Sequence, residues 1–275
     1  MMIGMAEFEK YLLRTETAIR LAGALLKKNL NTRAEAFHKG EVDLVTDLDR
    51  QSQKLLVGEI LSSFPGHAVL AEEDFLADGD SGFRWLIDPL DGTTNYSHTL
   101  PVFTVSVALE LRGEIVGGIV YDPMREEMFR AEAGSGAYLN GERIRVSQVA
   151  ALDRSLISTG FPYDVRQTAC NNLDHWGNFL VRAQAVRRCG SAAMDLCYVA
   201  CGRFDGFWEM KLKPWDIAAG AFMVREAGGR VTSFSGGPFK HDGLETLASN
   251  GLIHDQMLEV LAMGLRPENG EDKCV

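Results

Sequence analysis

The sequence has little of what a nucleic-acid binder, a secreted protein or a membrane protein needs. Its 275 residues carry a formal net charge of −10, so the basic surface that meets the phosphates of a nucleic acid is missing. Its five cysteines form no C-x-x-C pair and no cluster with histidine, which favours reduced, buried thiols over a zinc site. No apolar run approaches the length of a membrane span, and residues 1–10 lack a signal-peptide pattern. We therefore expect a cytoplasmic protein that binds neither nucleic acid nor membranes directly.

Several catalytic motifs are missing as well. The chain has no G-x-S-x-G nucleophile elbow and no G-x-x-x-x-G-K-[ST] phosphate loop. The D-x-D-x-T motif of phosphatases of the haloacid dehalogenase type is not matched either, because Asp88 and Asp91 are separated by two residues. A mechanism through a covalent aspartyl-phosphate is therefore disfavoured.

The pattern of apolar residues predicts an α/β fold. In the first part of the chain, helical spacing and β-prone runs predict helices over 7–30 and 48–60 and strands over 68–71, 85–87, 103–111 and 115–121. Later, helices over 169–183, 190–200, 215–227 and 255–263 alternate with strands over 156–159, 204–208, 230–234 and 246–249. We expect mixed and antiparallel sheets layered between helices, in a single domain over 1–266. Its halves cover about 1–150 and 151–266, and residues 267–275 form a disordered tail.

Carboxylates gather where the predicted elements begin or end. Glu72 follows the strand over 68–71, Asp88 and Asp91 follow the strand ending at Ile87, and Asp216 opens a helix. Hard oxygen ligands of this kind suit Mg²⁺, and carboxylates that lie close together require a cation or a proton. Two metals about 3.5–4 Å apart are the usual arrangement for in-line attack on phosphorus. After Asp91, the backbone amides from Gly92 onward can cradle a phosphate.

Each of these segments also has a plainer explanation. Pro, Asp, Gly and Asn over 88–95 are ordinary turn residues. Asp49 and Asp216 are each compatible with a helix-capping role, and Gly190-Ser191 with a cap for the helix that follows. A surface salt bridge explains Glu209 nearly as well as a substrate contact does. From the residues alone, these alternatives stay open.

Taken together, the segments resemble the inositol monophosphatase family. Trp85-Leu-Ile-Asp88-Pro-Leu-Asp91-Gly-Thr-Thr-Asn95 is similar to the first signature of the family, and Trp215-Asp216-Ile-Ala-Ala-Gly220 to the second. The segments around Asp49, Glu72 and Gly190 fit in the same order, so the resemblance runs from about residue 39 to 229. It implies an αβαβα sandwich, two or three Mg²⁺ ions, inhibition by Li⁺ and a homodimer.

The resemblance also implies roles for particular residues. Glu72, Asp88 and the Leu90 carbonyl would hold one Mg²⁺, Asp88, Asp91 and Asp216 a second, and Glu72 would reach a third. Asp49 and Thr93, with Glu72, would act in catalysis by polarising a metal-bound water. Substrate contacts are implied for Asp91, Gly92, Thr93, Gly190, Ser191, Ala192, Glu209 and Asp216. Lys39 falls near a basic residue of relatives.

The expected reaction is hydrolysis of a small polyol phosphate. The segment from Trp208 to Asp216 most resembles the branch that acts on inositol 1-phosphate. The alternatives are fructose-1,6-bisphosphatase, another phosphatase of the same superfamily, and a regulatory protein that keeps the scaffold and works through a protein partner.

Overall fold

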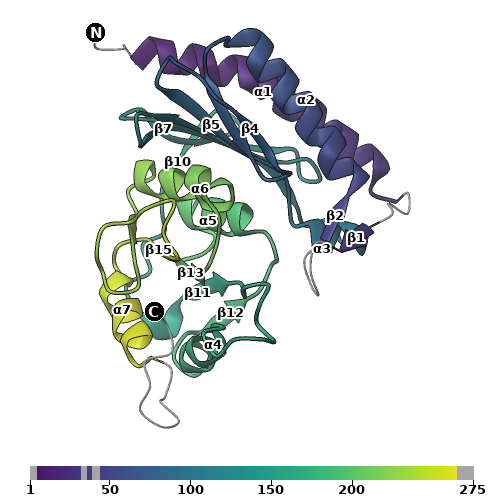
Figure 1. Ribbon diagram of the computed structural model, residues 1–275. Coiled ribbons are helices and arrows are strands. Elements are labelled where there is room, and N and C mark those ends of the chain that lie inside the picture. The colour runs from purple at the N-terminus through teal and green to yellow at the C-terminus, as the bar shows by residue number, and fades with distance from the viewer. Residues whose placement is uncertain (1–4, 32–35, 39–43, 265–275) are drawn as a thin grey trace.

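A computed structural model of the chain describes residues 5–31, 36–38 and 44–264. Helices and sheets alternate in five layers, which confirms the predicted αβαβα sandwich (Figure 1). The outer helices α1 (Met5–Asn29) and α2 (Asp47–Ser63) cover an eight-stranded sheet. The helices α5 (Ala192–Ala200) and α6 (Pro214–Glu226) separate it from a five-stranded sheet. On the far side of that second sheet lie α4 (Leu173–Leu180) and α7 (His254–Ala262).

The larger sheet is antiparallel except at one pair. In spatial order it contains β10 (Glu142–Ile144), β9 (Gly136–Leu139), β8 (Glu127–Glu132), β7 (Glu114–Asp122), β6 (Thr104–Leu111), β5 (Phe83–Asp91), β3 (Ala68–Ala71) and β4 (Phe75–Ala77). Strands β3 and β5 run parallel, so their carboxyl ends meet at the same edge. Leu12, Ile19 and Leu26 of α1 are fully buried in the core between this sheet and the outer helices, as their helical spacing predicts. A short separate hairpin pairs β1 (Ala36–His38) with β2 (Leu44–Thr46).

The smaller sheet contains β12 (Ala185–Arg187), β11 (Leu156–Thr159), β13 (Gly206–Met210), β15 (Glu245–Ser249) and β14 (Arg230–Thr232) in spatial order. The predicted helix over 169–183 is wrong at both ends, because α4 covers only Leu173–Leu180. Asn172 has a left-handed φ of 73° and its side chain donates to the Gly160 carbonyl at 2.6 Å. That bond holds the chain before Leu173 to the end of β11 and stops the helix there. Cys170 is disulfide-bonded, so the expectation of reduced thiols is wrong at that position, whereas Cys189, Cys197 and Cys201 are free thiols.

The central helices α5 and α6 are mostly apolar because each contacts both sheets. Ala218, Ala219 and Gly220 of α6 are buried, and a Cβ at Gly118 of β7 would lie 3.0 Å from the Ala219 Cα atom. Small residues thus allow the helix backbone to approach the sheet closely. Within the described ranges, no helix combines the length and apolarity of a membrane span.

Candidate active site

Residues from both halves of the chain line one cavity of about 310 Å³. All of the predicted metal and substrate residues lie in its wall: Glu72, Asp88, Leu90, Asp91, Gly92, Thr93, Gly190, Ser191, Ala192, Glu209 and Asp216. Asp49 is fully buried, and its Oδ1 atom lies 3.0 Å from the hydroxyl group of Thr93 in the cavity wall. Lys39 lies outside the described residues. The structure therefore gathers segments that are more than a hundred residues apart in the chain.

The first two carboxylates are placed by the parallel pair of strands. Glu72 follows β3, and its backbone amide donates to the Ile87 carbonyl of β5 at 3.1 Å, which extends the ladder by one residue. The next residue of β5 is Asp88, which is 2% exposed. Burial raises the pKa of Asp88 well above its ordinary value, and the negative charges of Glu72, Asp91 and Asp216 raise it further. The four carboxylates are thus close enough to repel one another.

An irregularity in β5 turns its last residues toward the cavity. The register of β5 against β6 shifts between Asp88 and Asp91, where Pro89 has no N–H to donate. The Asp88 Oδ1 atom accepts from the Leu90 amide at 2.9 Å, and the Pro89 carbonyl accepts from the Ser52 hydroxyl at 2.8 Å. The strand predicted over 85–87 therefore continues through the motif to Asp91, and α2 supports it from behind.

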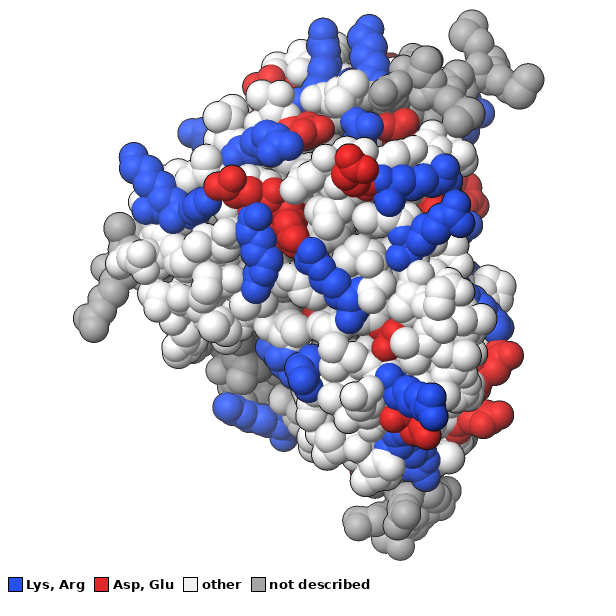
Figure 2. Space-filling model, turned by 180° about the vertical axis from the view of Figure 1, so that it is seen from behind, with Lys and Arg blue, Asp and Glu red and all other residues white. Residues whose placement is uncertain are grey.

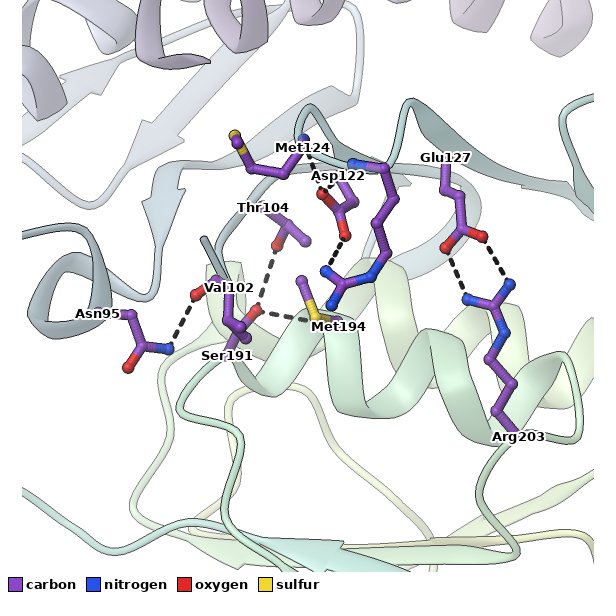
Figure 3. Close-up of polar contacts among 10 residues, drawn as sticks. Asn95, Val102, Thr104, Asp122, Met124, Glu127, Ser191, Met194 and Arg203 are labelled. Carbon is purple, nitrogen blue, oxygen red and sulfur yellow. Dashed lines mark hydrogen bonds and ion pairs between the residues drawn. The ribbon is translucent and has the colours of Figure 1, made fainter. Parts of the chain in front are cut away.

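Asp91 is held by the N-terminus of α5. Its Oδ2 atom accepts from the Ser191 hydroxyl at 2.7 Å and from the Ala193 amide at 2.8 Å. Ser191 is also the N-cap of α5, with its hydroxyl accepting from the Met194 amide at 3.4 Å (Figure 3). Burial raises the pKa of Asp91, while these hydrogen bonds oppose the rise. The capping explanation for Ser191 is therefore confirmed, and the cap also fixes a carboxylate.

The pair expected to act on water is in contact. The Thr93 hydroxyl lies 3.0 Å from the Asp49 Oδ1 atom and 3.1 Å from the Leu90 carbonyl, so it can donate to either. Gly92, just before it, has a left-handed φ of 103°, and a Cβ there would lie 3.0 Å from the Val102 carbonyl oxygen. Thr93 begins the five-residue helix α3 (Thr93–Ser97). The glycine is thus required both by the turn and by the close approach of the backbone.

Asp216 does not cap α6 in the way the capping alternative supposed. Lys213 is the N-cap and Pro214 the first helical residue, which leaves Asp216 at the third helical position. Its Oδ2 atom accepts from the Lys213 amide at 2.7 Å. Because Pro214 starts the helix earlier than expected, the carboxyl group reaches back across the first turn and into the wall of the cavity.

The opposite wall joins the two halves. Gly190 has a φ of 86°, and a Cβ there would overlap the side chains of Arg188 and Asn95. Asn95 donates to the Val102 carbonyl (Figure 3) and to the Cys189 carbonyl, each at 2.8 Å, which ties the first signature to the loop before α5. Glu209 is buried in β13 against Gly160, and burial raises its pKa well above the ordinary value, with Asp195 adding to the rise. The alternative that Glu209 forms a surface salt bridge is therefore wrong.

Besides Asp74, which lies close after Glu72, sequence reasoning missed four charged residues in the cavity wall: Arg188, Asp195, Lys211 and Lys213. Arg188 follows another arginine at the end of β12, a pattern that is common at a solvated edge, and Asp195 sits inside a predicted helix without a motif of its own. No local pattern separates these residues from ordinary surface charges. Their place in the wall follows from the approach of β12, α5 and the loop after β13.

The donor set of this cavity fits a hard cation. Among the described residues, no three His, Cys, Asp or Glu side chains converge closely enough to hold a metal ion by themselves. Mg²⁺ rarely needs such a cage, because it keeps several waters and binds one or two carboxylates together with substrate oxygens. Three carboxylates around the buried Asp88, with the Leu90 carbonyl beside them, offer that kind of site.

Comparison with known proteins agrees with this geometry. The model of the inositol monophosphatase family matches residues 9–266. The chain therefore belongs to the inositol monophosphatase family and is a phosphatase of that kind.

Relatives within the family carry two different names. An inositol-1-monophosphatase of Synechocystis sp. is 44% identical over 247 residues, 89% of this chain and 86% of that protein. The Nus factor SuhB of Escherichia coli (strain K12) is 46% identical over 223 residues, 80% of this chain and 84% of that protein. The structure of inositol monophosphatase from Anabaena (Nostoc) sp. superposes with a TM-score of 0.87 at 40% identity, over 95% of this chain and 98% of that chain.

Proposed function

We propose that this protein hydrolyses the phosphate monoester of a small polyol in the presence of Mg²⁺, with inositol 1-phosphate as its preferred substrate. The observation that carries the proposal is that the carboxyl groups of Glu72, Asp88, Asp91 and Asp216 line one cavity, with Asp88 itself buried. Such a group of carboxylates is unfavourable without a cation, and it lines a cavity large enough for a small ligand.

Glu72, Asp88, Asp91, Asp216 and the Leu90 carbonyl would hold two Mg²⁺ ions, and Glu72 would also reach a third. Bound Mg²⁺ supplies a Lewis acid that lowers the pKa of water and neutralises charge on the phosphoryl oxygens. The same residues would also place the phosphate against the cavity wall. Once bound Mg²⁺ balances the negative charge of these carboxylates, the site can accept an anionic ester.

Asp49 and Thr93 would orient the attacking water and take its proton. The Thr93 hydroxyl is within donating distance of Asp49, so its lone pairs are free to accept a hydrogen bond from a water in the cavity. As the water attacks phosphorus, its proton passes to the Thr93 oxygen while the Thr93 proton passes to Asp49. The bond between phosphorus and the ester oxygen breaks, and the leaving alkoxide takes a proton from a water in the cavity, while Asp49 returns its own proton to solvent.

The remaining wall would bind the substrate itself. The amides of Gly92 and Thr93 would bind phosphate, while Gly190, Ala192 and Glu209 would face the polyol. Lys and Arg side chains lie among Asp and Glu side chains on the face of the molecule in Figure 2. That nucleic acid is not a direct partner stays a prediction from the net charge of −10. A cytoplasmic location and a homodimer stay predictions from the sequence.

The test is phosphate release from inositol 1-phosphate, fructose 1,6-bisphosphate, adenosine 3′,5′-bisphosphate and NADP. Each substrate is assayed with Mg²⁺, with EDTA, and with Mg²⁺ plus Li⁺. We expect release that requires Mg²⁺, is fastest on inositol 1-phosphate and is inhibited by Li⁺. If another substrate is hydrolysed fastest, the proposed reaction stands but inositol 1-phosphate is not the preferred substrate. If folded protein with Mg²⁺ releases phosphate from none of the substrates, the proposal is refuted.

A second candidate is regulation through a protein partner. It is favoured by one observation, the 46% identity to a relative named Nus factor SuhB. The two functions separate in a strain whose own gene is deleted. If an inactive Asp88→Asn variant restores the deletion phenotype as well as the wild type does, regulation is the function that the cell requires; if it fails, catalysis is.

A further inference from the structure

The cavity wall contains a buried acidic residue that the reaction above does not use. Asp195 lies in the first turn of α5, is 1% exposed and lines the cavity together with Glu209 and Arg188. Its Oδ1 atom is buried and makes no hydrogen bond. A carboxyl oxygen buried without a donor costs free energy, and native structures contain few of them. A hydroxyl group of a bound ligand would supply the missing donor.

The neighbours of Asp195 leave its Oδ1 atom without a donor. The Ser158 hydroxyl and the Cys189 thiol interact with the carboxyl group and lower its pKa, but neither makes a hydrogen bond of good geometry to Oδ1. The charged groups nearby are Asp91, Arg188 and Glu209. Burial raises the pKa of Asp195 to about 8. At neutral pH the carboxyl group therefore keeps a proton and can both donate and accept a hydrogen bond, as a hydroxyl partner requires.

A role in helix stability does not explain the burial. An acidic side chain in the first turn interacts favourably with the helix dipole whether or not it is buried. Asp174 occupies the first turn of α4 and does so at the surface, where its charge remains hydrated. The helix would gain the same interaction from an exposed residue, so the position of Asp195 inside the cavity requires a different reason.

We propose that Asp195 is a substrate-binding residue that hydrogen-bonds one hydroxyl of the polyol, next to the hydroxyl bound by Glu209. The inference rests on the proposed function and specifies its substrate class. Two buried carboxyl groups in one wall fit an alcohol with neighbouring hydroxyls, such as a cyclic polyol. Phosphate esters whose alcohol part carries no further hydroxyl leave both groups unpaired and gain nothing from them.

The test compares two substrates in matched variants. Asp195→Ala is expected to lower kcat/KM for inositol 1-phosphate by about 10- to 100-fold, mainly through KM, because a hydrogen bond to a buried group is lost. For 4-nitrophenyl phosphate, which has no hydroxyl to bind, the change should stay below about twofold. Asp195→Asn keeps a donor and an acceptor and should restore most of the loss. Asp174→Asn, which removes a first-turn carboxylate outside the cavity, should alter neither substrate.

Equal losses on both substrates would make Asp195 a structural residue and overturn the inference. If Asp195→Ala is active and the ratio of its two kcat/KM values equals that of the wild type, the inference is overturned while the proposed function stands. If the wild type released phosphate from neither substrate, the proposed function would fail, and calorimetric binding of inositol 1-phosphate would decide the inference by itself. Weaker binding by Asp195→Ala than by the wild type supports it; equal binding, or none, overturns it. Should Asp195→Ala not fold, the same comparison is made with Asp195→Asn and Asp195→Ser.

Discussion

The Ser191 hydroxyl donates a 2.7 Å hydrogen bond to the Oδ2 atom of Asp91, a residue exactly one hundred positions earlier in the chain. The Ala193 amide donates to the same oxygen at 2.8 Å, and Thr104 lies 3.5 Å from it. The Oδ2 atom is therefore occupied by the protein itself, which leaves Oδ1 as the atom that can bind a cation. Ser191 thus acts as a positioning residue for Asp91, beyond the substrate contact expected from the sequence.

Removing the Ser191 hydroxyl should weaken Mg²⁺ binding. We expect Ser191→Ala to raise the Kd for Mg²⁺ by about 10- to 100-fold, the usual effect of losing a group that orients a ligand. The loss of the α5 cap should also lower the free energy of unfolding by about 1 kcal/mol. Calorimetric titration with Mg²⁺ and denaturant unfolding measure the two effects. Ser191→Thr, which keeps the hydroxyl, is the control, and an unchanged Kd in Ser191→Ala would refute the positioning role.

The contact between Thr93 and Asp49 predicts a loss in turnover rather than in binding. Thr93→Ala removes the hydroxyl that lies 3.0 Å from Asp49, so kcat should fall by about 10²- to 10⁴-fold. The KM and the affinity for Mg²⁺ should stay within about threefold, because the backbone amide at position 93 is retained. Thr93→Ser should keep most of the activity. A parallel rise in KM and fall in kcat would instead indicate a role in holding the substrate.

Neutralising either Asp91 or Asp216, both proposed to hold Mg²⁺, should abolish turnover and leave the fold intact. Asp91→Asn and Asp216→Asn are each expected to lower kcat/KM by about three orders of magnitude or more. An amide oxygen can still accept from Ser191 or from the Lys213 amide, so circular dichroism and Tm should change little. Asp153→Asn, at an exposed position outside the cavity, serves as the control. Near-normal activity in either variant would remove that residue from the site.

The acidic site should make stability depend on pH and on Mg²⁺ together. Because the pKa of Asp88 in the folded protein is raised by burial and by its acidic neighbours, the native state binds that proton more tightly than the unfolded chain does. The resulting stabilisation is complete below the unfolded pKa of about 3.9 and is lost as the pH rises through the folded pKa. Mg²⁺ opposes the loss, since it binds the deprotonated carboxylates and stabilises by about 2.7 kcal/mol at a concentration of 100 Kd.

We therefore expect the difference in Tm between Mg²⁺ and EDTA to increase as the pH rises from about 5 to 8. Thermal unfolding by differential scanning fluorimetry over that range measures it. Asp88→Asn, which cannot ionise, should show both a smaller dependence on pH and a smaller effect of Mg²⁺. A difference in Tm that is the same at every pH would contradict the idea that the carboxylates bind the ion.

A substitution at Gly160 tests the role of Glu209 in substrate binding without changing Glu209 itself. A Cβ at position 160 would overlap the Glu209 carboxyl group, so Gly160→Ala should push that side chain out of place. We expect the same change in substrate preference as in Glu209→Ala, with the affinity for Mg²⁺ unchanged in both. Relative kcat/KM values for inositol 1-phosphate and fructose 1,6-bisphosphate measure it. If Gly160→Ala alters Mg²⁺ binding as strongly as substrate preference, Glu209 is part of the metal site instead.

Much of the fold could be predicted because its signals are local. The stripe of Leu12, Ile19 and Leu26 indicates one face of a helix without reference to the rest of the chain. The Asn140-Gly141 dipeptide has the two positive φ angles, 50° and 86°, that a tight hairpin needs. Strands β1, β2, β4, β8 and β12 were missed, since they are short or carry little periodicity and are ordered mainly by pairing with neighbouring strands.

By itself, the sequence determined the family, the layered α/β fold and the carboxylates of the family motifs, because each depends on a motif or a pattern of residues close together in the chain. Only the tertiary structure decided which oxygen of Asp91 is occupied, where α4 begins, and that Asp195 is buried beside Glu209. Those features depend on hydrogen bonds and burial between segments brought together by the packing of α5 between the two sheets. Local periodicity and motif spacing do not predict these contacts, because the contacts are stabilised by the packing of the whole core and not by neighbouring residues in the chain.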